Sequence, residues 1–265
     1  RPQFGSKLKE VTRTGIEMML AVDVSNSMLA QDFEPSRLER TKFAIDRLTQ
    51  QLEQDRIGLI VFAGDAYMQL PITSDYVAAR SFAAQISPTM VSKQGTAIGA
   101  AIDLAASSFS SGSEGSRVIV VISDGENHED DALAAAKAAA EKGIRIYTIG
   151  IGTPEGAPIS IDGEFIKDEQ GDMVVSKLDE QMLEQIALTT GGAYIRATNR
   201  SLGLDEIVQK INEVEKKELT STVFEDFNEQ YQYLIGLALA LLLLEFAMLE
   251  RRSRLLARFN IFRKR

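Results

Sequence analysis

Four short, predominantly apolar runs, separated by amphipathic helical patterns, constrain the fold of this chain most. The runs lie at 18–22, 57–62, 118–122 and 144–149. Strands that are apolar throughout, without polar alternation, are typical of a parallel sheet covered by helices on both faces. Their alternation with helices predicts an α/β fold with a doubly wound, mostly parallel and Rossmann-like sheet.

Apolar residues recur at helical spacing between these runs and after them. Helices are expected near 38–52, 75–86, 97–109, 132–142, 182–186 and 204–217. Ser36 and Glu39 form a capping box at the start of the first of these helices. The run at 67–70 precedes Pro71 and predicts an edge strand. Short strands are also expected at 193–196 and in a β-hairpin insertion at 159–175.

Polar residues follow two of the buried strands directly. Asp23, Ser25 and Ser27 come after the first strand, and Asp124 comes after the strand at 118–122. Thr96 lies just before a predicted helix, whose positive N-terminal end should favour an anionic ligand. In a doubly wound fold such turns gather at one edge of the sheet, where ligands bind. All five side chains are hard oxygen donors, which suit Mg²⁺, with Ca²⁺ and Mn²⁺ as alternatives.

Asp23-x-Ser25-x-Ser27, Thr96 and Asp124-Gly125 resemble the metal-ion-dependent adhesion site of von Willebrand factor A (vWA) domains. The resemblance covers residues 14–217. It implies that Ser25, Ser27 and Thr96 bind a metal through their hydroxyls, with Asp23 and Asp124 close by, often through water. A first shell of neutral hydroxyls would leave the cation able to take a carboxylate from another protein.

The whole chain is also similar to the BatA/BatB proteins of the bacterial aerotolerance operon. Segments that carry this similarity include 62–66, 123–128 and 175–179. It implies an accessory, scaffold or adhesion-type role in the cell envelope, with sibling Bat proteins and AAA+ ATPases of the MoxR type as partners. Relatives of this kind carry membrane helices ahead of the point where this sequence begins, so 1–13 is expected to follow such a helix.

Residues 231–249 predict a membrane-spanning helix because they contain a single charged residue, Glu245. The segment 218–230 would link this helix to the vWA domain. The tail at 250–265 contains seven Lys or Arg residues, and the positive-inside rule places it in the cytoplasm. The vWA domain is then expected on the periplasmic, extracytoplasmic side of the bacterial inner membrane.

Composition excludes several classes of function. The chain has no cysteine and one histidine, so thiolate and multi-histidine metal sites are excluded. Its formal net charge is −9 despite the basic tail, which argues against nucleic acid as the ligand. No nucleophile motif or phosphate-binding glycine loop is present, so we expect no enzyme. A metal-dependent hydrolase that uses the same site, with His128 as base, is the alternative.

Residues beside the predicted site are candidates for partner contact. Asn26, Met28, Asp65 and His128 lie on the turns that flank it, and Phe33 lies nearby. The acids between Glu126 and Asp131 either bind a second cation or cap a helix.

Overall fold

The computed structural model describes the chain in two units, 13–216 and the combination of 1–12 with 217–265. The described residues are 3–8, 15–52, 55–109, 116–127, 129–161, 163–198, 201–221, 225–229 and 231–250. The predicted basic tail therefore lies outside the described residues, as does His128.

A six-stranded sheet forms the centre of the larger unit. In spatial order its strands are β11 (Tyr194–Arg196), β6 (Arg145–Gly150), β5 (Arg117–Ser123), β2 (Glu17–Asp23), β3 (Arg56–Phe62) and β4 (Ala66–Thr73). Neighbouring strands run parallel except β4, which pairs antiparallel with β3 at the edge. The predicted doubly wound, mostly parallel sheet is confirmed, and the apolar run at 67–70 is the edge strand that was predicted.

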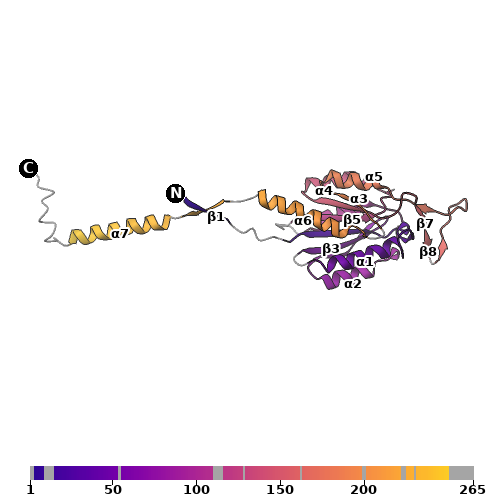
Figure 1. Cartoon of the computed structure of the whole chain (residues 1–265), viewed down its shortest axis with the longest axis horizontal. Helices are drawn as coiled ribbons and strands as arrows, with labels where there is room; N and C mark the ends of the chain where they lie inside the picture. The colour runs from indigo at the N-terminus through magenta and orange to yellow at the C-terminus, as the bar shows by residue number, and fades with distance from the viewer. Residues whose placement is uncertain are drawn as a thin grey trace, which may run out of the picture. The chain divides into compact units, whose positions relative to one another are not determined.

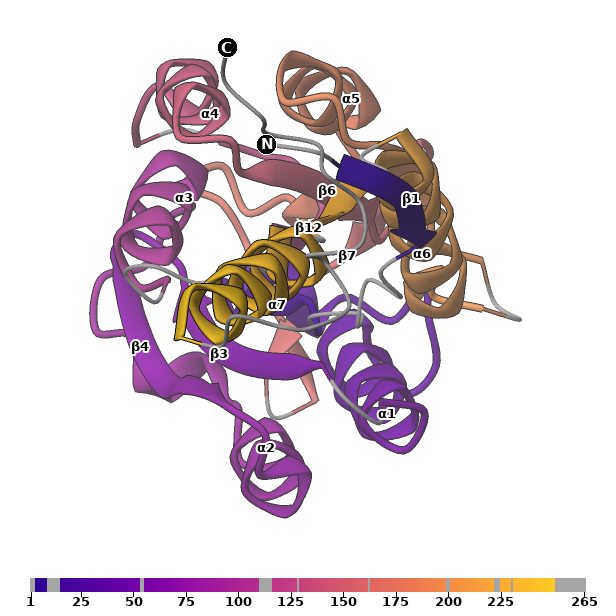
Figure 2. The same ribbon diagram turned by 90° about the vertical axis from the view of Figure 1, so that its left-hand side faces the viewer.

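Six helices cover the sheet, three on each face (Figures 1 and 2). One face carries α1 (Arg37–Thr49), α2 (Tyr76–Ala84) and α6 (Leu204–Ser221), and the other carries α3 (Ile98–Ser107), α4 (Ala132–Glu141) and α5 (Glu180–Thr189). Strand residues alternate between the two cores, so that Met18 and Leu20 face one and Met19 and Ala21 the other. This two-sided burial explains why the strands consist mainly of apolar residues without polar alternation.

The insertion after β6 is more elaborate than the single hairpin that the sequence predicts. Four short strands occur there: β7 (Ala157–Pro158), β8 (Ser160–Ile161), β9 (Glu164–Phe165) and β10 (Val175–Ser176). β7 pairs with β10 and β8 with β9, both antiparallel. Gly163, at φ 86°, sits in the β8–β9 connection, which adds a turn inside the predicted first strand.

The smaller unit contains a strand pair and a helix. β1 (Gln3–Leu8) pairs antiparallel with β12 (Glu225–Glu229), so part of the predicted 218–230 linker is a strand. α7 (Tyr231–Glu250) follows, and its described leucines between 237 and 244 are about 60% exposed. In α7 the structure describes the side chains of residues 235–245. Among the described residues, no helix has both the length and the apolar character needed to cross a membrane.

Candidate metal site at the carboxyl edge of the sheet

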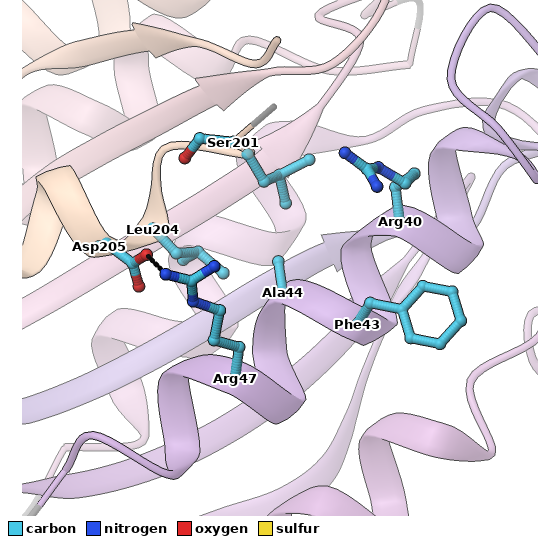
Figure 3. A pocket seen from close by; sticks show the side chains of 8 residues that line it. Arg40, Phe43, Ala44, Arg47, Ser201, Leu204 and Asp205 are labelled. Carbon is cyan, nitrogen blue, oxygen red and sulfur yellow. Dashed lines mark ion pairs between the residues drawn. The ribbon is translucent and has the colours of Figure 1, made fainter. Parts of the chain in front are cut away.

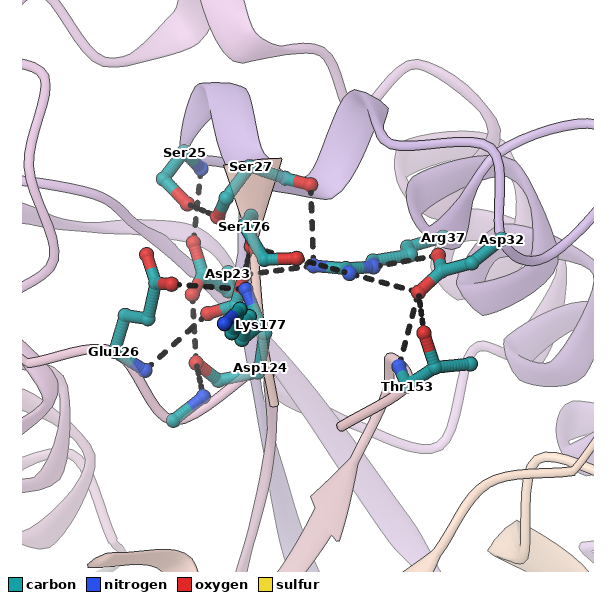
Figure 4. A network of polar contacts seen from close by, with 12 residues as sticks. Asp23, Ser25, Ser27, Asp32, Arg37, Asp124, Glu126, Thr153, Ser176 and Lys177 are labelled. Carbon is teal, nitrogen blue, oxygen red and sulfur yellow. Dashed lines mark hydrogen bonds and ion pairs between the residues drawn. The ribbon is translucent and has the colours of Figure 1, made fainter. Parts of the chain in front are cut away.

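The turn after β2 is organised by the last residue of that strand. Asp23 is fully buried, and its Oδ1 accepts a hydrogen bond of 2.8 Å from the Ser25 amide. This bond folds the chain back, so that the Ser25 and Ser27 hydroxyl oxygens lie 2.9 Å apart (Figure 4). A short 3₁₀ turn, η1 (Asn26–Leu29), then leads away from the strand. Two hydroxyl oxygens and a carboxylate therefore lie together at the end of the central strand.

The turn after β5 meets the turn after β2 because the two strands are parallel neighbours. The Ser123 hydroxyl donates a 2.7 Å hydrogen bond to Asp23 Oδ2 and accepts one of 3.0 Å from the Gly125 amide. Asp124 is as fully buried as Asp23. Ser123, which the sequence analysis did not single out, is thus the direct link between the two strand ends.

Asp23 is costly to ionise in this position. Burial, followed by the charge of Asp124, raises the pKa of Asp23 to about 7. A cation placed among these oxygens would offset both effects, because it stabilises the charged carboxylates. The electrostatics of this edge therefore favour a bound cation.

Thr96 reaches the same edge from the other side of β3. It is 4% exposed, and the loop that carries it is held by a 2.7 Å bond from the Ala97 amide to the Ala63 carbonyl, just after β3. In the described part of the chain no hydrogen bond joins Thr96 to Asp23, Ser25, Ser27 or Asp124. The structure thus connects four of the five predicted residues. Asp23, Ser25 and Ser27 are joined by direct bonds, and Arg37 Nη1 donates to both the Ser27 carbonyl and Asp124 Oδ2.

The N-terminus of α3 is not free to bind a ligand, contrary to the prediction. Asp130 accepts hydrogen bonds from the Gly99 and Ala100 amides at 3.0 and 2.7 Å. Asn127 Oδ1 accepts one of 3.2 Å from the Ile98 amide. The amides that usually face an anion at a helix start are therefore occupied by this chain's own side chains.

The acids between Glu126 and Asp131 each have a structural partner. Asp131 caps α4 by accepting from the Ala134 amide, as the helix-capping alternative predicts. Glu129 forms an ion pair with Lys93, and Glu126 accepts from the Lys177 amide. The described residues hold no group of three or more His, Cys, Asp or Glu placed to bind a metal. A metal at this edge would consequently need the serine and threonine hydroxyls.

Arg37 joins the site to two other segments, at Asp32 and Ser176, and no motif in the sequence had singled it out. It is the first residue of α1 and is fully buried. Its Nη1 donates to Asp124 Oδ2 at 3.0 Å and to the Ser176 hydroxyl at 2.8 Å, and that hydroxyl donates to Asp124 Oδ2 at 2.9 Å (Figure 4). Asp124 Oδ2 thereby accepts two hydrogen bonds, whereas the one bond that Oδ1 accepts from the described residues is a 3.3 Å bond from the Glu126 amide. Oδ1 is the oxygen left to face a metal or its water.

The other side of Arg37 is held by Asp32. Both Asp32 oxygens accept from the guanidinium at 2.8 Å, and Oδ2 also accepts from the Thr153 amide at 2.9 Å. Burial raises the pKa of Asp32, but Arg37 and Thr153 together bring it below its ordinary value. A cation at a helix N-terminus opposes the helix dipole. An arginine at the first position of a predicted helix therefore indicates that acidic side chains from other segments contact it, and this was the one sequence feature that could have pointed to Arg37.

Two of the predicted partner contacts are wrong. Met28 and Phe33 are 0% and 3% exposed because they pack into the core under α1, so they are structural. Asn26 is half-buried and Asp65 exposed beside the site, which leaves both as predictions. His128 lies outside the described residues.

A separate hollow of about 160 Å³ lies between α1 and the start of α6 (Figure 3). It is lined by Arg40, Phe43, Ala44, Arg47, Ser201, Leu202, Leu204 and Asp205. Arg47 and Asp205 form an ion pair of 3.2 Å across it. It shares no residue with the oxygen cluster.

The sequence and the fold of this chain are similar to those of known proteins. The model of the von Willebrand factor type A domain matches residues 17–210. A solved aerotolerance-related membrane protein from Bacteroides fragilis is 52% identical, with a TM-score of 0.72, and covers 75% of this chain and 100% of its own. The conserved hypothetical protein BatB from Bacteroides thetaiotaomicron is 51% identical, with a TM-score of 0.73, over 76% of this chain and 100% of its own.

More distant relatives extend the comparison. An uncharacterized protein of Borreliella burgdorferi is 30% identical over 250 residues, which are 92% of this chain and 72% of that protein. A mussel byssus matrix protein, solved with zinc in its MIDAS motif, is 15% identical with a TM-score of 0.56 over 77% of this chain and 46% of its own. This last likeness shows the shared fold.

Proposed function

Because the chain belongs to the von Willebrand factor type A domain family, in its aerotolerance-related Bat group, we propose that it is a metal-dependent protein-binding module. One divalent cation binds Ser25, Ser27 and Thr96, with Asp23 and Asp124 beside it. The cation then takes an Asp or Glu carboxylate from a partner protein. The observation that carries this proposal is the Ser25–Ser27 hydroxyl pair, 2.9 Å apart, beside two fully buried carboxyl groups.

The charge balance supports carboxylate binding. Arg37 contacts Asp124 at 3.0 Å and so offsets part of its negative charge. Asp23 is then the main anionic group that faces the cation, and the hydroxyls are neutral. A cation in this setting keeps positive charge that a partner's carboxylate neutralises.

Mg²⁺ is the metal that we favour. Hydroxyl and carboxylate oxygens are hard ligands, which suit Mg²⁺, Ca²⁺ and Mn²⁺. Zn²⁺ belongs in the same titration because a mussel protein of this fold holds zinc in its motif.

Metal binding is tested by calorimetry on the full chain at pH 8, where Asp23 is largely ionised. We expect wild type to bind Mg²⁺ and Asp23→Ala to give no measurable heat, because the variant lacks the carboxylate that also positions Ser25. Asp65→Ala is the matched control, since it removes an exposed aspartate near the site, and it should bind like wild type. Equal heats for wild type and Asp23→Ala would refute the site.

A carboxylate alone does not supply the affinity of a stable complex. A micromolar complex requires about 8 kcal/mol of binding free energy. One carboxylate on a solvated metal contributes a few kcal/mol at most. The partner must therefore contact protein surface around the metal. Sibling Bat proteins and a MoxR-type AAA+ ATPase in an envelope complex are the partners that we propose.

We further propose that 231–249 anchors the protein in the bacterial inner membrane. The segment contains a single charged residue, and its described leucines are exposed, as in a helix that meets lipid. A structural relative is also named as a membrane protein. The basic residues after 250 favour a periplasmic position for the vWA domain.

This orientation predicts the outcome of protease treatment of spheroplasts. We expect the protease to digest the vWA domain and to spare a tag placed after Arg265, because only the domain faces outward. Detergent-lysed spheroplasts, in which both are cleaved, are the control. A protected domain with a digested tag would reverse the topology.

A further inference from the structure

The insertion between β6 and α5 presents a row of apolar side chains on one face. Lys167 and Met173 form an antiparallel bridge, so their side chains point to the same side. Phe165 is two residues from Lys167 and Val175 two residues from Met173, and residues two apart in a strand share a face. Phe165, Met173 and Val175 therefore form one stripe, the insertion stripe.

The insertion stripe is open to solvent. Its three side chains are 52%, 54% and 45% exposed, and they are large apolar groups outside both hydrophobic cores. Contiguous exposed apolar surface of this kind marks interaction sites more often than single exposed residues do. No core requirement in the described residues accounts for these side chains.

The insertion stripe begins one residue from a contact of the candidate metal site, with Val175 and Ser176 pointing to opposite faces of β10. Val175 precedes Ser176, whose hydroxyl donates to Asp124 Oδ2 at 2.9 Å and accepts from Arg37. The next residue, Lys177, donates its amide to Glu126 at 3.0 Å. Figure 4 shows this end of the insertion lying against Asp124 and Arg37. The base of the stripe therefore lies one residue from the contacts that hold Asp124, on the outer face of the insertion.

The polar residues of the insertion indicate the charge of its partner. Glu164, Asp168, Glu169 and Asp172 are exposed, and Lys167 is the one basic residue between 163 and 173. An acidic surface attracts basic side chains and repels acidic ones. A partner that docks here should be basic except for the carboxylate that reaches the metal.

We propose that the insertion stripe is the second half of the partner-binding surface. Its occupant is a protein segment in which one carboxylate is flanked by apolar and basic side chains. The carboxylate binds the metal, the apolar side chains cover Phe165, Met173 and Val175, and the basic ones pair with the acids of the insertion. This inference rests on the proposed function, and it identifies the chemistry of the partner.

The test uses a displayed library of random 12-residue peptides and the full chain in a neutral detergent with Mg²⁺. We expect the enriched peptides to contain an Asp or Glu between apolar and Lys or Arg residues. A variant with Phe165→Ser, Met173→Ser and Val175→Ser should bind these peptides at least tenfold more weakly and bind Mg²⁺ unchanged. The control carries Val77→Ser, Phe82→Ser and Leu188→Ser, which are exposed apolar residues on α2 and α5, and should behave like wild type.

The outcomes separate this inference from the function on which it rests. No enrichment in Mg²⁺, or peptides that bind the stripe variant as tightly as wild type, would overturn the inference. Peptides that need Phe165, Met173 and Val175 but bind equally well in EDTA would support the stripe as a docking surface and overturn the metal-dependent function. A stripe variant that loses Mg²⁺ binding as well would also overturn the inference, because it requires the two halves to bind separately.

Discussion

Replacement of Arg37 by methionine is expected to lower the free energy of unfolding by roughly 3–5 kcal/mol. Methionine keeps much of the side-chain volume but leaves Asp124, which is fully buried, without its cation, and it removes both 2.8 Å contacts to Asp32. An unpaired buried carboxylate is far more costly than a missing surface charge. Urea denaturation of the full chain measures the effect. Unfolding is monitored by far-UV circular dichroism because the chain has no tryptophan to serve as a fluorescence probe.

Arg47→Met on the same helix is the matched control. The Arg47 side chain is 70% exposed, and its ion pair with Asp205 lies at the surface, so its loss should cost only about 0–1 kcal/mol. Adding Asp124→Asn to Arg37→Met removes the unpaired charge and should recover part of the lost stability. Equal losses for Arg37→Met and Arg47→Met, or no recovery in the double variant, would show that Arg37 has no such electrostatic role.

The sheet was predictable because its signal is local. Each buried strand contains a predominantly apolar run, interrupted only in β6 by Arg145 and Thr148. The end of each run lies within two residues of the end of the strand in the structure. Since the strands are parallel, their ends must meet at one edge, and this placed Asp23 and Asp124 together from the sequence alone. The serine pair followed because Ser25 and Ser27 belong to the same turn as Asp23.

Side-chain contacts between distant segments were not predictable where no sheet edge brings the segments together. Asp130 caps α3 from 30 residues away, which changed a helix end that appeared free in the sequence into an occupied one. Arg37 meets Ser176 across 139 residues, and no pattern near either residue announces that contact. Met28 occupies a turn beside the site but packs inward, because a short 3₁₀ turn buries one of its sides.

Gly125 combines a strained backbone with a close approach to another segment. Its φ is 81°, which an L side chain rarely adopts, and a Cβ atom there would overlap the carbonyl oxygen of Asp179. The Asp179 amide in turn donates a 2.8 Å hydrogen bond to the Asp124 carbonyl. The backbone at the start of α5 therefore packs directly on the turn that holds the second carboxylate of the candidate site.

Gly125→Ala should consequently weaken both folding and metal binding. The unfavourable φ costs about 1–2 kcal/mol and the steric overlap roughly 1–3 kcal/mol more. Because the overlap can be relieved only by moving the turn or Asp179, Asp124 must shift away from Asp23 and Ser123, and we expect Mg²⁺ affinity to fall at least tenfold.

Gly143→Ala separates the two causes: its φ is 70°, but nothing lies within 4 Å of a Cβ there, so it should lower stability only through the unfavourable φ and bind Mg²⁺ like wild type. Thermal denaturation and calorimetry on both variants measure the two effects. If Gly125→Ala bound Mg²⁺ as tightly as Gly143→Ala, the position of Asp124 would not matter for the metal, and Asp23 with the hydroxyls would have to hold it alone.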